Sequence, residues 1–96
     1  MGSTRGRVWT ALHFAAQEGS LDISKLLLDN VARVDVQDAY GNTALNRAVF
    51  FSGGSGELIR LLLEHGADRN LKNRKGISPL DLANRTTNFD LKQFFK

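Results

Sequence analysis

The stretch Thr10–Ala16, which reads TALHFAA, decides how the chain folds, because two related stretches follow it. The second is Thr43–Val49, reading TALNRAV, and the third is Ser78–Asn84, reading SPLDLAN. Their first residues are 33 and then 35 positions apart. A repeat of this length indicates stacked units, each of which buries its apolar face on its neighbours. Three such units are about the minimum for a stable stack.

The first unit is expected to contain two helices. Thr10 can cap the first one, and Gly19 can stop it at its C-terminal end. The second helix carries apolar residues at helical spacing, which predict one broad buried face. Those residues are Leu21, Ile23, Leu26, Leu27 and Leu28. Phe14 in the first helix is also predicted to lie in the core.

The other two units follow the same plan with local differences. A turn over residues 38–41 precedes a helix from Thr43 to about Phe50, and the glycine-rich stretch 52–56 holds a two-residue insertion before the next helix. Gly66 is expected to end that helix in the left-handed conformation. In the third unit Pro79 suits a first helical position. A short final helix over residues 89–95 presents a polar side, as a terminal unit needs.

These motifs resemble the ankyrin repeat family. Its pattern is D-x-x-G-x-T-P-L-H-x-A-A-x-x-G, then a leucine-rich helix and G-A-D; Leu61–Asp68 reads LLLEHGAD, and Thr10–Gly19 also matches well. The resemblance implies an all-α ankyrin-repeat solenoid of helix-turn-helix units with short hairpin-like turns. It implies a single domain over residues 1–96, with repeats at about 5–37, 38–72 and 73–96.

Departures from the family pattern carry their own expectations. Arg5 and Val8 stand where the pattern has Asp and Gly, so the first turn is expected to be absent or frayed. Val31 stands where the second repeat has its glycine, so we expect Asn30 to take the left-handed conformation or the loop to differ. Arg47 replaces an apolar residue and must point outward or form an ion pair. In the family, a histidine at the position of His13 resembles a hydrogen-bonding brace for the turns.

The residue types argue against catalysis. The chain has no cysteine, and its two histidines are far apart with no acid at metal-ligand spacing. The glycine-rich stretch lacks the Lys-Ser/Thr of a phosphate-binding loop. No apolar run approaches the roughly 20 residues of a membrane span. We therefore expect no enzyme activity, no cofactor, no metal, no small-molecule substrate and no membrane contact, and a cytoplasmic location.

A protein-binding module is the leading hypothesis. The family resemblance implies that contacts come from the turns and the exposed ends of the first helix of each unit. The matching residues are Trp9, Tyr40, Asn42, Phe50, Phe51, Arg74, Lys75, Ile77 and Arg85. Exposed aromatic residues mark interaction sites on their own account. Two alternatives stay open, because Phe50 and Phe51 can cover the insertion instead, and Trp9 can shield the N-terminal end of the stack.

The charge distribution indicates the chemistry of the partner. Residues 69–96 carry seven basic and two acidic side chains, whereas the whole chain has a net charge of +3. This asymmetry favours an acidic protein partner for a monomeric chain. Two stretches, GNTALNRAVF and GISPLDLANRTTNFDLKQFF, resemble small bacterial ankyrin proteins that act as immunity partners of toxins. The alternatives are a fragment of a longer regulatory ankyrin protein and, more weakly, nucleic-acid binding through the basic third repeat.

Overall fold

The fold consists of short helices joined by turns. The computed structural model describes residues 10–30, 33–52, 56–86 and 90–95. Its elements are α1 (Ala11–Glu18), α2 (Leu21–Asp29), α3 (Ala44–Phe50), α4 (Glu57–Glu64), α5 (Pro79–Arg85) and the 3₁₀ helix η2 (Leu91–Phe95). No residue within these described ranges is in a strand. The all-α prediction is therefore confirmed for this part of the chain.

The first residue of each repeated stretch is a helix cap. Thr10, Thr43 and Ser78 each accept a hydrogen bond from the backbone N–H three residues ahead. The side chain at that third position bonds back to the backbone of the cap residue, which completes a capping box. The repeated stretch thus fixes where α1, α3 and α5 begin.

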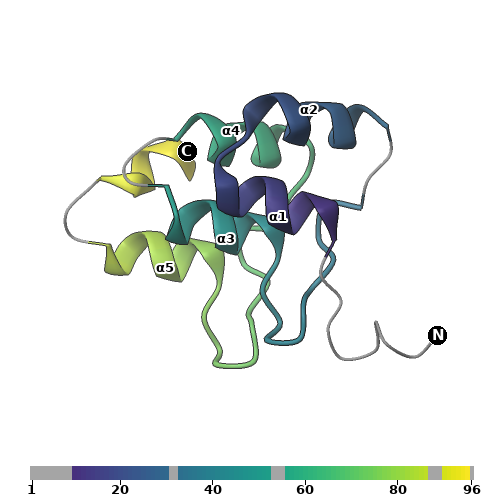
Figure 1. Ribbon diagram of the computed structural model, residues 1–96. Coiled ribbons are helices and arrows are strands. Elements are labelled where there is room, and N and C mark those ends of the chain that lie inside the picture. Colours follow the sequence, from purple (N-terminus) through teal and green to yellow (C-terminus); the bar gives the residue numbers. More distant parts are fainter. Residues whose placement is uncertain (1–9, 31–32, 53–55, 87–89, 96) are drawn as a thin grey trace.

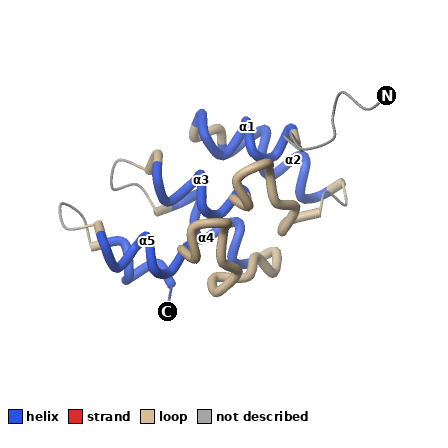
Figure 2. Tube along the Cα trace, turned by 90° about the horizontal axis from the view of Figure 1, so that it is seen from below, coloured by secondary structure: helices blue, strands red, loops and turns tan. Residues whose placement is uncertain are grey.

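The helices form two rows, as Figure 1 shows. Helices α1, α3 and α5 lie side by side in chain order, and α2 and α4 lie above them in this view. Helix η2 packs against both α4 and α5. Two loops project from the stack on the same side, and the view from below in Figure 2 shows them next to each other. We call residues 37–42 the first finger and residues 72–77 the second finger.

The core lies between the two rows and between neighbouring pairs of helices. Leu45, Ile59 and Leu62 are fully buried at its centre. Small side chains such as Ala16 and Ala48 allow the helices of the row α1, α3 and α5 to approach closely. Leu91 and Phe95 of η2 belong to the same core. The final short helix therefore covers the C-terminal side of the stack.

The predicted apolar face of α2 is largely wrong. Leu28 is buried, but Leu21, Ile23 and Leu26 are exposed by 37, 52 and 63%. Leu58, which occupies in α4 the position of Ile23 in α2, is only 7% exposed. The difference has a simple cause, because α4 has α2 as a neighbour on this side and the described residues place no helix there for α2.

The structure also corrects the expectation for Phe14 and removes one of the two alternatives for Asn30. Phe14 is 54% exposed rather than part of the core, because the described residues leave its side of α1 uncovered. Asn30 is not left-handed; its φ is −107°, and its side-chain amide donates to the Leu26 carbonyl at 2.7 Å. Helix α2 thus ends without a left-handed residue at that position, whereas Gly66 after α4 has the expected φ of +89°. Val31 lies outside the described residues.

Candidate functional site

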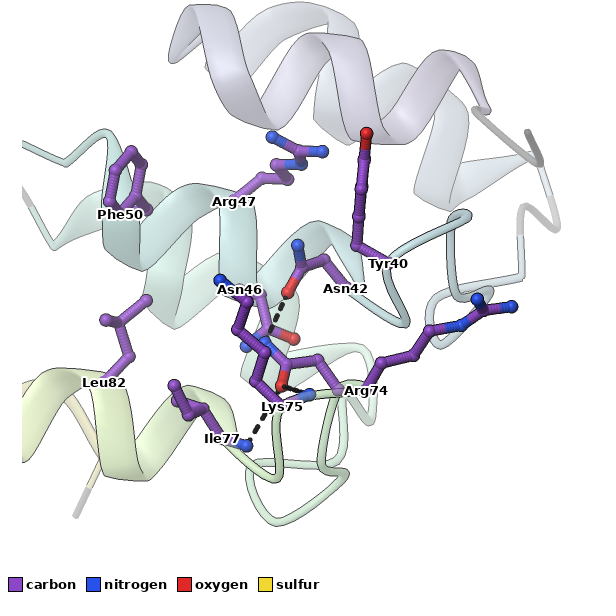
Figure 3. Close-up of a pocket in the computed structure, with 10 residues that line it drawn as sticks. Tyr40, Asn42, Asn46, Arg47, Phe50, Arg74, Lys75, Ile77 and Leu82 are labelled. Carbon is purple, nitrogen blue, oxygen red and sulfur yellow. Dashed lines mark hydrogen bonds between the residues drawn. The ribbon is translucent and has the colours of Figure 1, made fainter. Parts of the chain in front are cut away.

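A hollow of about 350 Å³ opens between the two fingers and the helices α3 and α5. Figure 3 shows it with its lining side chains. They are Tyr40, Asn42, Asn46, Arg47, Phe50, Asn73, Arg74, Lys75, Ile77 and Leu82. Both repeats contribute, so the hollow exists only because the two units are stacked.

Hydrogen bonds between the fingers hold one side of the hollow. The Arg74 N–H donates to the Tyr40 carbonyl at 3.0 Å, and the Asn73 amide donates to the Asn42 side-chain oxygen at 2.9 Å. Gly41, with φ of +80°, faces this contact, and a Cβ atom there would lie 2.8 Å from the Arg74 nitrogen. Only glycine allows the two fingers to come this close.

An ion pair connects the first finger to α3. The Arg47 guanidinium donates to the Asp38 carboxylate at 2.8 Å, which confirms that this arginine must pair or point outward. Asp38 also accepts the backbone N–H groups of Tyr40 and Asn42. Burial alone would raise the pKa of Asp38, but the Arg47 hydrogen bond and the two backbone N–H groups outweigh it and hold the pKa below its usual value.

The third residue of each capping box differs between repeats. His13 accepts the Thr10 N–H at Nδ1, so its Nε2 carries the proton and donates to the Asn42 carbonyl of the next finger at 2.8 Å. This confirms the expected bracing role of His13. Asn46 occupies the same position in α3 and accepts from the Thr43 backbone N–H through its oxygen. Its amide nitrogen is buried and has no hydrogen-bond partner among the described residues.

Exposed aromatic and basic side chains surround the hollow. Tyr40 and Phe50 are 69 and 68% exposed. Arg74 and Lys75 are exposed, and neither forms an ion pair with a described residue. In Figure 3 Tyr40 and Arg47 extend toward α1, and Arg74 extends away from the hollow.

Two other cations, which precede or begin the second finger, form contacts within the chain. The Arg69 guanidinium donates to the Phe95 carbonyl and lies over the ring of that residue. The Lys72 ammonium donates to the Asp81 carboxylate at 3.2 Å. The basic cluster seen in the sequence is therefore not one continuous surface, which weakens the nucleic-acid hypothesis.

The hollow unites six of the nine residues selected from the sequence. They are Tyr40, Asn42, Phe50, Arg74, Lys75 and Ile77. Phe51 packs its ring edge-to-face on Phe50 at 4.9 Å, but it lines a separate depression beside α1 and α4. Arg85 is exposed and lines neither depression. Trp9 lies outside the described residues.

Asn42 and Ile77 are less exposed than the sequence analysis expected. Asn42 accepts hydrogen bonds from His13 and Asn73, so it joins neighbouring repeats. Sequence reasoning also omitted four residues that line the hollow, which are Asn46, Arg47, Asn73 and Leu82. The signal for Asn46 was present, because it replaces the histidine found at position 13.

The described residues contain no group of three or more His, Cys, Asp or Glu that could hold a metal ion. Within the same residues, no helix has the length and apolar character needed to cross a membrane. The hollow offers hydrogen-bond donors, cations and apolar walls, and groups of these kinds can bind a ligand or a partner surface.

Paired helices in two rows, with fingers on one side and an open hollow beside them, define a stacked-repeat protein. The family described as ankyrin repeats, in three copies, matches residues 1–73. The chain therefore belongs to the ankyrin repeat family, and its fold is the all-α solenoid of that family. Ankyrin repeats generally mediate protein–protein interaction.

Two curated proteins illustrate the similarity. Serine/threonine-protein kinase 12 of Arabidopsis thaliana is 43% identical over 58 residues, which are 60% of this chain and 12% of the kinase. A putative ankyrin repeat protein of Acanthamoeba polyphaga mimivirus is 28% identical over 89 residues, which are 93% of this chain and 12% of the viral protein. The chain thus spans about an eighth of the length of either relative.

Proposed function

We propose that the chain is a non-catalytic binding module that holds an acidic protein partner on its finger side. Tyr40 and Phe50 act as apolar anchors, while Arg74 and Lys75 attract the acidic groups. The observation that carries the proposal is the meeting, around one hollow, of exposed aromatic rings and of cations that pair with no described acid. Aromatic residues and arginine supply much of the energy at protein interfaces.

The proposal keeps several finer expectations from the sequence. They are a monomeric chain, a cytoplasmic location, and a single domain whose repeats divide near residues 37 and 72. In a narrower form the partner is a toxin and the chain its immunity protein, which rests only on the resemblance of two stretches. In the alternative form the chain is part of a longer regulatory ankyrin protein.

The test compares variants of the anchor and of the cations. A partner is first isolated with the parent chain and identified. Its rates of association and dissociation are then measured by surface plasmon resonance. Tyr40→Ala should raise the dissociation rate by about 30-fold, equivalent to roughly 2 kcal/mol. Reversing both Arg74 and Lys75 to Glu should slow association and reduce its salt dependence, because rim charges chiefly steer.

Lys25→Ala is the control, because Lys25 is exposed on α2 in the other row of helices. It should bind like the parent. If Lys25→Ala abolishes binding while the Tyr40 and finger variants bind normally, the finger side is not the binding surface.

A further inference from the structure

We propose that the hollow is a subsite for a carboxylate side chain of an acidic peptide segment, with Asn46 as its hydrogen-bond donor. This inference rests on the proposed function and specifies which group of the partner enters the hollow. Three features of the site support it: a donor without a partner among the described residues, two cations that no described acid neutralises, and an apolar wall.

The donor is the amide nitrogen of Asn46. This side chain is only 3% exposed, and it lines the hollow. Its oxygen is occupied by the Thr43 backbone N–H at 3.1 Å, which fixes the oxygen toward the cap. The nitrogen therefore points elsewhere, and no described residue accepts from it. A buried donor without an acceptor destabilises the structure, so a ligand that accepts a hydrogen bond from it gains binding free energy.

A comparison with the first repeat explains why the donor is left over. His13 reaches from its cap to the Asn42 carbonyl. The corresponding carbonyl for Asn46 belongs to Ile77, which accepts the Asn73 N–H just as that of Asn42 accepts the Asp38 N–H. The amide of Asn46 is shorter than an imidazole and does not bond to it. The substitution thus leaves a buried donor that has no acceptor among the described residues, on a side chain that lines the hollow.

The charge at the hollow selects an anionic acceptor over a neutral one. Lys75 lines it, and Arg74 lies at its edge with a side chain that extends away from the hollow in Figure 3; no described acid neutralises either side chain. Asp38, the nearest buried acid of the first finger, is already paired with Arg47. Hydrogen bonds to an ionised group are roughly twice as strong as those between neutral groups. A carboxylate therefore fits better than a side-chain amide of the same shape.

The apolar wall indicates what stands beside the carboxylate. Phe50, Ile77 and Leu82 line the hollow from α3, the second finger and α5. In Figure 3 Ile77 and Leu82 extend from the α5 side toward α3. An aliphatic neighbour of the acidic residue can cover these side chains. The expected segment is therefore an acidic residue next to a leucine or isoleucine.

The experiment uses two blocked hexapeptides that differ at one residue. One has a Leu-Glu pair between glycines, and the other has Leu-Gln in its place. Binding to the full chain is followed by NMR through the side-chain amide signal of Asn46. The Leu-Glu peptide should bind about tenfold more tightly than the Leu-Gln peptide, and it should shift the Asn46 signal.

Asn46→Asp removes the donor but should keep the helix cap. Asp81 already performs this function in α5, where it accepts the Ser78 N–H at 3.0 Å. The variant should lose binding of the Leu-Glu peptide by about tenfold or more, because a like charge replaces a donor. Asn84→Asp adds the same charge at an exposed position of α5 that does not line the hollow. It should bind within about twofold of the parent.

The double variant Arg74→Gln, Lys75→Gln tests the site independently if Asn46→Asp does not fold. In this variant the ratio of the affinities for the Leu-Glu and Leu-Gln peptides should fall to near one. Equal binding of the two peptides to the parent, or an unmoved Asn46 signal, overturns the subsite. If neither peptide binds while the natural partner still depends on Tyr40, the subsite is wrong and the proposed function stands.

Discussion

At the scale of single residues, the Asp38 side chain forms several hydrogen bonds that hold the first finger together. Its carboxylate accepts the backbone N–H groups of Tyr40 and Asn42 and the guanidinium of Arg47. These bonds fix the finger that presents Tyr40 and hold it against α3. The pKa of Asp38 lies below its usual value because they favour the charged form more than burial opposes it.

This lowered pKa makes a prediction about stability and pH. A carboxyl whose pKa is lower in the folded state stabilises the fold above its unfolded pKa, which is about 3.9. That contribution should disappear as the pH falls from about 4 through the folded pKa. Asp38→Asn should therefore cost about 2 kcal/mol at neutral pH and lose less stability on acidification than the parent.

Urea unfolding from pH 7 to pH 2 checks this prediction. Asp90→Asn is the control, because Asp90 is exposed and precedes η2. The role of Asp38 is refuted if both variants lose stability in parallel with the parent below pH 4.

At the scale of elements, the distance between the two fingers depends on a glycine. Gly41 and Gly76 end equivalent turns with φ of +80° and +76°. A Cβ on Gly41 would meet the backbone of Asn73 and Arg74, whereas a Cβ on Gly76 would meet nothing within 4 Å. The two positions share the backbone conformation and differ in the close approach of the fingers.

Alanine at each of these two glycines separates conformational strain from the clash. Gly76→Ala should lower the free energy of unfolding by about 1–2 kcal/mol, because alanine is strained in the left-handed backbone conformation. Gly41→Ala should cost about 1–3 kcal/mol more, because the second finger must move. Thermal unfolding of both variants measures the difference. Equal losses would mean that the fingers separate easily.

The paired helices α2 and α4 allow a second matched comparison. Leu62 is fully buried in α4, while Leu26 is 63% exposed in α2. Leu62→Ala should destabilise the chain by about 2–5 kcal/mol. Leu26→Ala should change stability by no more than about 0.5 kcal/mol. Denaturant midpoints of both variants decide the matter, and a large loss for Leu26→Ala would contradict its exposed position.

These examples show what the sequence could and could not predict. Caps and glycine turns were predictable, because Thr10 and Gly66 follow local rules of hydrogen bonding and backbone conformation. The exposure of Leu26 was not predictable from the sequence. Hydrophobic periodicity shows which residues share a helix face, but it does not show whether another element covers that face. Leu61, at the same position in α4, is partly buried.

In the candidate site, too, some features were predictable from the sequence and others were not. Tyr40 and Phe50 were predictable from position and residue type, and the structure finds both exposed. Phe51 lines a separate depression, because one further residue turns the direction of the side chain by about 100° around the helix axis. The sequence shows that Asn46 replaces the histidine of the first repeat, but the hydrogen bonds show that its nitrogen has no partner among the described residues.

At the scale of the whole molecule, the main helix contacts in the described part of the chain join each helix pair to its neighbours. Helix α3 contacts α1 and α5, and α4 contacts α2 and η2. The middle pair therefore shares an interface with both ends. The C-terminal end is held by Phe95, which is 3% exposed, and by Phe94, whose ring lies 5.2 Å below the Arg60 guanidinium. Gly56 leaves room for that ring, because a Cβ there would overlap it.

This arrangement predicts that damage at either end unfolds the whole stack. In a repeat protein the stability is roughly the sum of unit and interface terms, and about three units are the minimum for a stable fold. Phe95→Ala should cost about 3–5 kcal/mol and Leu12→Ala, in the buried face of α1, about 2–5 kcal/mol. Each should shift one cooperative transition without changing its denaturant slope, because the surface exposed on unfolding stays the same. The measurement is urea unfolding followed by circular dichroism and by tryptophan fluorescence together. If Phe95→Ala gives a separate early transition or a smaller slope, η2 unfolds independently and the C-terminal pair is not part of a single cooperative unit.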